Sequence, residues 1–194
     1  IVVGFPSPLF VVILGVLIGM FAGFYGGVTD SILSRITDIF FGIPLVLGGI
    51  LLLASFPSGP ETPKWGTMGK VSVVLAILGW TSLTRITRST VIQVKQADYV
   101  NAARALGGDA KRILRLHVLP NALAPVIVYA TIVLGIFIST EATLSYLGIG
   151  LQPPVISWGV AINDAAGLVR QSPHMLLFPA AFLSVTILAF IMMG

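Results

Sequence analysis

Residues 118–140 read VLPNALAPVIVYATIVLGIFIST, a run of 23 residues without a charged side chain. An α-helix rises about 1.5 Å per residue, so this run is long enough to cross the hydrocarbon core of a bilayer. The whole chain has the same character: 194 residues, of which 56% are strongly hydrophobic and 9% are charged, with a mean hydropathy of +1.02. Soluble domains carry about 25% charged residues. The composition therefore excludes an ordinary soluble domain, a disordered tail and a nucleic-acid-binding domain, and it indicates a membrane protein.

Long apolar stretches recur along the chain, so we expect an all-α, polytopic membrane helix bundle in a single transmembrane domain. About five transmembrane helices are predicted, over residues 9–25, 36–56, 70–92, 118–147 and 175–194. Gly42 and Pro44 predict a bend in the second of these. Gly15, Gly19 and Gly23 form a small-residue seam at helical spacing, which we interpret as a packing contact within the chain.

The basic residues are concentrated in one part of the chain. Residues 85–117 contain seven Lys or Arg and two acidic residues, a net charge of +5, whereas the remainder has a net charge of −1. Cytoplasmic loops of membrane proteins carry such an excess of Lys and Arg. We therefore place residues 95–117, which we later name the coupling loop for the role that a family resemblance implies, in the cytoplasm. Alternating crossings then place residues 148–173, the outer loop, on the opposite side.

Several kinds of site are not expected. The chain has no cysteine, and His117 and His174 belong to no metal-binding motif, so we predict neither a metal site nor catalytic residues. Acidic residues within spans are candidates for function because burying them is costly. Asp38 is expected to pair with Arg35. Glu141 and Ser145 are candidates for residues of a transport pathway or its gate. Glu141 either faces such a pathway or caps a loop.

The coupling loop contains the most informative pattern. The stretch QADYVNAARALGG, residues 96–108, predicts a short helix that ends in a left-handed turn at Gly107 and Gly108. Its small residues Ala102 and Ala103 would let another protein approach closely. Asp109 would cap a second short helix, and Pro120 would start the following span. The alternative is an ordinary amphipathic loop that lies on the membrane.

The same residues carry a resemblance to a known family. The run YVNAARALGGDAKRILRLHVLPN, residues 99–121, resembles the EAA loop in permease subunits of ABC importers, in the version of the dipeptide, oligopeptide and nickel permeases. Residues 141–159, EATLSYLGIGLQPPVISWG, and 19–30, GMFAGFYGGVTD, are also similar to that family. Two residues depart from its pattern: Asn101 stands where Glu is usual, and His117 where Ile is usual.

The resemblance implies a mechanical role for the coupling loop. The short helix would be a coupling helix seated on a cytoplasmic ATP-binding subunit. The expected contact residues are Asp98, Tyr99, Asn101, Ala102, Ala103, Arg104, Leu106 and Gly107. By alignment with the family, the first of its six transmembrane helices and its cytoplasmic tail are expected to be missing from this sequence.

The resemblance also implies partners. The chain would form half of a pathway for di- or oligopeptides with a second permease, two ATP-binding subunits and an extracytoplasmic binding protein. The outer loop would dock that protein through Gln152, Pro153 and Trp158. No phosphate-binding loop of the form G-x-x-x-x-G-K-[ST] occurs in the chain, so ATP and Mg²⁺ are expected only on the partner subunits. The location would be a bacterial or archaeal plasma membrane.

Two alternatives stay open at this point. An importer of nickel or another small solute in the same family would share these features, since the binding protein sets most of the specificity. A secondary transporter would need acidic residues that couple to an ion and usually an internal repeat. The sequence has few intramembrane acids and no convincing repeat, so this second alternative is disfavoured.

Overall fold

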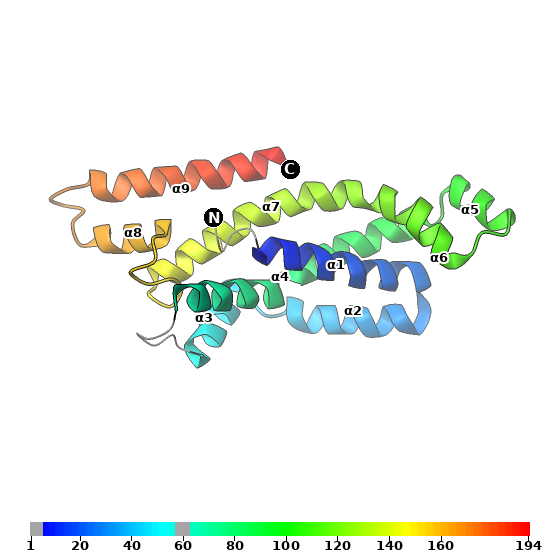
Figure 1. Ribbon diagram of the computed structural model, residues 1–194, viewed down its shortest axis with the longest axis horizontal. Helices are drawn as coiled ribbons and strands as arrows, with labels where there is room; N and C mark the ends of the chain where they lie inside the picture. Colours follow the sequence, from blue (N-terminus) through cyan, green and yellow to red (C-terminus); the bar gives the residue numbers. More distant parts are fainter. Residues whose placement is uncertain (1–5, 57–62) are drawn as a thin grey trace. The chain divides into compact units, whose positions relative to one another are not determined.

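The computed structural model describes residues 6–56 and 63–194, and every regular element within them is a helix. The predicted all-α class is confirmed. In chain order the elements are α1 (Pro6–Tyr25), α2 (Gly27–Phe41), α3 (Leu45–Ser55), α4 (Lys64–Val94), α5 (Asp98–Ala105), α6 (Ala110–Ile113), the π-helical turn η1 (Leu114–Val118), α7 (Leu119–Tyr146), α8 (Trp158–Ala166) and α9 (His174–Met193) (Figure 1).

Four stretches of the described chain are helical, long and apolar enough to cross a membrane: Ser7–Tyr25, Trp65–Val94, Ala110–Tyr146 and His174–Met193. The broken pair of α2 and α3 would make a fifth. This agrees with a polytopic helix bundle of about five spans. The break between α2 and α3 lies at Gly42–Pro44, where the bend was predicted, and Pro44 is the N-cap residue of α3.

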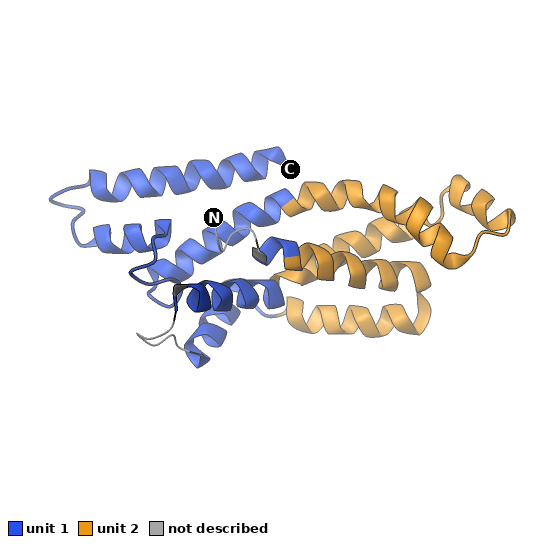
Figure 2. Cartoon of the chain, viewed as in Figure 1, with its two compact units in different colours: residues 1–9, 43–78, 131–194 blue, residues 10–42, 79–130 orange. Residues whose placement is uncertain are grey.

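The chain divides into two compact units (Figure 2). Unit 1 comprises Ile1–Leu9, Ile43–Leu78 and Thr131–Gly194, and unit 2 comprises Phe10–Gly42 and Gly79–Ala130. The boundaries fall inside α1, α4 and α7, so each of these helices contributes to both units.

In unit 2 the backbones of α1 and α4 meet at the glycine seam. A Cβ atom added at Gly15 would lie 2.9 Å from Cβ of Leu83, and one added at Gly19 would lie 2.6 Å from the carbonyl oxygen of Thr84. At Gly23 the corresponding distance to the carbonyl oxygen of Arg88 is 2.8 Å. Such distances leave no room for a side chain. The prediction that the seam packs within the chain is confirmed.

The turn between α1 and α2 is shorter than its glycine-rich sequence suggests. Gly26 and Gly27 adopt φ values of 68° and 56°, a region that other residues rarely enter, and α2 already begins at Gly27. Figure 1 shows the resulting antiparallel hairpin of α1 and α2.

Two ion pairs join α2 to α4 within unit 2. Arg88 binds Asp30 through two contacts, at 2.5 Å from Nε and 2.6 Å from Nη2. Asp38 pairs with Arg85, at 2.6 Å, so the expected pairing with Arg35 is wrong. An ion pair three residues apart on one helix is worth only about 0.2–0.5 kcal/mol, and helix packing brings the Arg85 guanidinium within reach instead.

In unit 1 small residues again mark close helix contacts. Gly49 of α3 lies against the side chain of Leu144 on α7, and Gly135 of α7 lies against the backbone of α9 at Ile187. Gly159 of α8 packs directly on the backbone of Ala142. Since lipid chains are as apolar as leucine, close van der Waals contact of this kind is a main source of helix association in a membrane.

The glycine seam generates a stability prediction. We expect Gly19→Ala to destabilise the full-length protein by about 1–3 kcal/mol, because the new methyl group would overlap the α4 backbone. Gly69→Ala is the matched control, since nothing lies within 4 Å of its Cβ position and alanine favours helix. Thermal unfolding in detergent measures both. Equal melting temperatures for the two variants would contradict the packing described above.

Candidate functional site

The predicted coupling helix is α5, and it is anchored by its own apolar face. Val100 has no exposed surface and packs in a cluster of unit 2. The other buried members of the cluster are Met20, Val91, Ile113, Val118 and Ala122. They come from α1, α4, α6, η1 and α7, so α5 is attached to all of these elements.

The C-terminal end of α5 has the predicted left-handed turn. Gly107 has φ 82°, its N–H donates to the carbonyl oxygen of Arg104, and the N–H of Gly108 donates to that of Ala103, both at 2.9 Å. This is the Schellman arrangement, which satisfies carbonyl groups that a helix end leaves open. The end of α5 is therefore fixed by backbone geometry.

The remaining predicted contact residues lie mostly on the outer side of α5. Leu106 is 89% exposed and Tyr99 is 46% exposed. Asp98, Asn101, Ala102, Arg104 and Gly107 are exposed as well. Ala103, in contrast, is half-buried and packs against the Val100 cluster, so it belongs to the anchoring side of the helix.

Asn101, which replaces the usual Glu of the motif, bonds within the coupling loop. Its Nδ2 group donates to the carbonyl oxygen of Gln96 at 3.2 Å, and Arg104 donates to its Oδ1 at 3.4 Å. Asp98, at the start of α5, and Arg104, near its end, have the charges that the helix dipole favours at those positions.

Lys95 is a residue of the coupling loop that the sequence analysis missed. Its ammonium group donates to the carbonyl oxygen of Gly23 at 2.7 Å, in the last turn of α1. Carbonyl groups at a helix C-terminus lack partners within the helix, and lysine commonly binds them. This contact could not be predicted, because the sequence did not reveal that the end of α1 lies beside the coupling loop.

The second half of the coupling loop continues directly into α7. The helix runs without interruption from Ala110 to Tyr146, and Asp109 occupies the N-cap position of α6 without a side-chain bond. The expected new start at Pro120 is therefore wrong. In an α-helix the proline ring would clash with the carbonyl group four residues earlier. Pro120 follows directly on the π turn η1, where the regular α-helical hydrogen-bond ladder is already interrupted.

In unit 1, Glu141 and Ser145 hold the segment predicted as the outer loop. The Ser145 hydroxyl donates to the Glu141 carboxylate at 2.7 Å and accepts the N–H of Leu151 at 2.9 Å. Ser157 caps α8, where its hydroxyl accepts the N–H of Val160. Asn163 of α8 donates to the carbonyl oxygen of Tyr146 at 2.5 Å. This supports loop capping for Glu141, and a role in the pathway stays a prediction.

The predicted docking residues lie on the same loop. Gln152 and Pro153 are exposed, and Gln152 donates to the carbonyl oxygen of Gly148 at 2.6 Å. Trp158 is partly covered, because its ring stacks on Phe182 of α9 with a centroid distance of 5.8 Å. Docking therefore stays a prediction for these three residues.

A family model matches residues 15–194, most of the chain, and describes a binding-protein-dependent transport system inner membrane component. The chain belongs to this family. Its resemblance to ABC importer permeases is thereby confirmed, and its apolar helices agree with a multi-pass membrane protein.

Curated relatives of this transport family are similar over nearly the whole chain. The oligopeptide permease OppC of Bacillus subtilis is 36% identical and the dipeptide permease DppC of the same organism is 37% identical, each over 99% of this chain. The glutathione permease GsiD of Pectobacterium atrosepticum is 34% identical over 98%. The chain covers 60%, 58% and 61% of these proteins, respectively.

A solved structure has the same fold. The crystal structure of an amino acid ABC transporter with histidines matches with a TM-score of 0.70, covering 97% of this chain and 84% of its own. The two sequences are 17% identical, so this likeness concerns the fold alone.

The Ser145 bond to the outer loop can be tested directly. We expect Ser145→Ala to raise the exchange rate of the Leu151 amide roughly tenfold, because its acceptor is lost. Hydrogen–deuterium exchange of peptides from residues 148–157 measures this. Thr143→Ala is the control, since its exposed hydroxyl bonds to the carbonyl oxygen of Ser139 in its own helix. Unchanged exchange in Ser145→Ala would show that the outer loop is held by other contacts.

Proposed function

We propose that the full protein is the membrane-spanning half of an ATP-driven importer for di- and oligopeptides, with α5 as its coupling helix. The observation that carries this proposal is the two-sided character of α5. One side is fixed to the bundle through the fully buried Val100, while Leu106 and Tyr99 project from the other. An exposed apolar residue on a firmly held helix is suited to fill a pocket of a partner protein.

A force on α5 would reach the spans through a short chain of contacts. Val100 contacts the cluster that includes Met20 of α1 and Val91 of α4, and Lys95 binds the end of α1. The fixed turn at Gly107 connects α5 to α6, which continues into α7. Movement of the partner would thus reorient several spans together, as coupled domain closure requires.

The ATP-binding partners would hydrolyse the ATP that drives transport. The chain has no phosphate-binding loop, so two ATP-binding subunits would hold ATP and Mg²⁺ and hydrolyse it, and this chain would have no enzymatic role. A second permease would complete the pathway. An extracytoplasmic binding protein would deliver the substrate to the outer loop, with Gln152, Pro153 and Trp158 as its docking residues, and Glu141 and Ser145 would lie near the pathway.

The substrate class is supported by the names of the relatives. Those names describe transport of oligopeptides, dipeptides and glutathione, all of which contain peptide bonds. We therefore favour short peptides over nickel or another small solute. The bacterial inner membrane is the proposed location, since the relatives named above are bacterial proteins and the family is one of inner membrane components.

A change at the tip of α5 tests the coupling role. We expect Leu106→Asp to reduce peptide-stimulated ATP hydrolysis of the assembled transporter at least tenfold, because a carboxylate cannot enter an apolar pocket without a large desolvation cost. Leu106→Met is the matched control, because it keeps an apolar side chain of similar size at the same exposed position. Both variants should insert and melt like the parent protein. Full activity of Leu106→Asp would remove α5 from the coupling contact.

Competition for uptake tests the substrate class. In proteoliposomes that contain the complete transporter and its binding protein, we expect unlabelled di- and tripeptides to compete with a labelled dipeptide, and Ni²⁺ to have no effect. The reason is that a site shaped for peptide groups is left with unpaired polar groups when a bare cation occupies it. ATP-dependent uptake of nickel without peptide uptake would favour the rival substrate and leave the permease role unchanged.

A further inference from the structure

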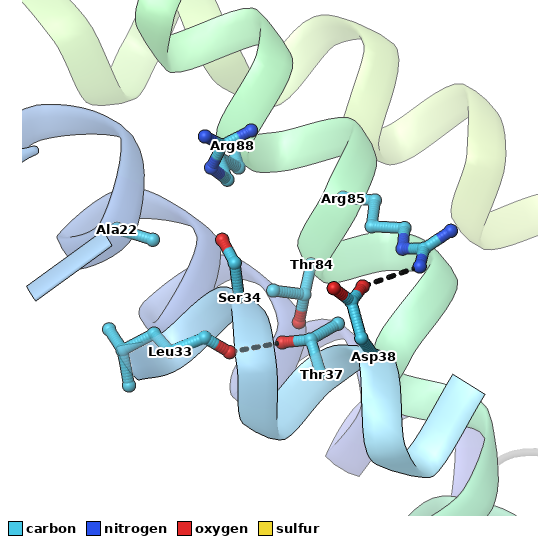
Figure 3. A pocket seen from close by; sticks show the side chains of 8 residues that line it. All are labelled: Ala22, Leu33, Ser34, Thr37, Asp38, Thr84, Arg85 and Arg88. Atoms are coloured by element: carbon cyan, nitrogen blue, oxygen red, sulfur yellow. Dashed lines mark hydrogen bonds and ion pairs between the residues drawn. The ribbon is translucent and has the colours of Figure 1, made fainter. Parts of the chain in front are cut away.

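Unit 2 contains a polar cavity of about 350 Å³ between α1, α2 and α4 (Figure 3). Its polar lining consists of Ser34, Thr37, Asp38, Thr84, Arg85 and Arg88. Small-molecule sites in proteins typically have volumes of about 300–1,000 Å³, so this cavity is suited to a compact ligand or to one chemical group of a larger ligand.

The hydroxyl groups of the cavity can only accept further hydrogen bonds. Thr37 and Thr84 each donate to the backbone carbonyl oxygen four residues earlier, at 2.8 and 3.1 Å. Ser34 donates to the carboxylate of Asp30 at 3.1 Å. A hydroxyl has one proton to donate and two lone pairs that accept. With the proton used, these walls favour a ligand that brings N–H groups.

The charged groups differ in how much binding capacity they retain. Arg88 is committed to Asp30 through two contacts. Arg85 and Asp38, in contrast, share a single contact between Nη2 and Oδ1, and their side chains are 46% and 52% exposed. In the described part of the chain, Oδ2 of Asp38 and the other N–H groups of Arg85 are left for a ligand. Figure 3 shows this pair at the cavity, with Thr84 and Thr37 beside it.

We propose that the cavity binds the primary ammonium group of a zwitterion. The ammonium group would donate to Asp38 Oδ2 and to the hydroxyl oxygens of Thr37 and Thr84, and the neighbouring anionic group would meet the Arg85 guanidinium. Charge-assisted bonds of this kind are the strong ones in proteins. A neutral ligand would use neither charge, and a quaternary ammonium group has no N–H to donate.

Two sources could provide this chemistry. One is the phosphoethanolamine headgroup of a membrane lipid, and the other is the amino end of a short peptide. The peptide source rests on the proposed function, since it would make the cavity part of the substrate's route. The lipid source depends only on the membrane location of the chain.

Binding assays on the full-length permease distinguish these sources without transport or ATP hydrolysis. In the lipid arm, native mass spectrometry compares adducts of phosphatidylethanolamine and phosphatidylcholine with identical acyl chains. In the peptide arm, calorimetry in phosphatidylcholine nanodiscs compares alanylalanine with N-acetyl-alanylalanine. We expect about a tenfold preference for the primary ammonium compound in at least one arm.

Variants then show whether the preference for the primary ammonium compound arises in the cavity. We expect Asp38→Asn to reduce it to near unity and Thr84→Val to reduce it several-fold, because each removes an acceptor from the cavity. Asp164→Asn on α8 makes the same chemical change at an exposed acid outside the cavity and should retain the preference. The phosphatidylcholine adduct serves as an internal baseline, since a folding defect would lower both lipid adducts together.

Either arm supports the proposal when its preference disappears in Asp38→Asn and persists in Asp164→Asn. The proposal is overturned when neither arm prefers the primary ammonium compound, or when the preference survives in Asp38→Asn. A failure of peptide uptake, in contrast, would bear on the proposed transport function and leave the result of the lipid arm intact.

Discussion

The backbone contact between α1 and α4 is the constraint on which unit 2 depends. In a membrane, helices gain little from hiding apolar surface from one another, so close approach must supply the attraction. Gly15, Gly19 and Gly23 permit that approach. It brings the end of α1 to Lys95 and places Met20 beside Val91 in the cluster that holds α5. The position of the proposed coupling helix is thus a consequence of three missing side chains on α1.

Local chemistry explains which features could be predicted from the sequence. The helical spans follow from apolar length, the end of α5 from the need for a left-handed residue at Gly107, and the break after α2 from Gly42 and Pro44. Each depends on residues within one or two turns of the feature itself. For the same reason the seam on α1 was recognisable, although the sequence did not reveal that α4 is its partner.

Features that join distant residues could not be predicted in this way. The partner of Asp38 is 47 residues away, and the carbonyl group that Lys95 binds is 72 residues away. Neither pairing has a local signal. The start of α8 did have one, because Ser157 is a favoured N-cap residue whose hydroxyl accepts the N–H of Val160. The helix is continuous across Pro120, directly after the π turn η1, and the sequence analysis found no local signal for that turn.

The π turn at Leu114–Val118 also affects how motion can pass along the helix. Such a turn accommodates one residue more than the α-helical ladder would at the same point. If the wide turn moves along the helix, each residue that it passes rotates by about 100° around the helix axis, since an α-helix has 3.6 residues per turn. This movement requires only that a few backbone hydrogen bonds break and form again. A movement of the coupling loop can therefore reach α7 in two ways, as a displacement of the helix or as a rotation of its side chains around an axis that stays in place.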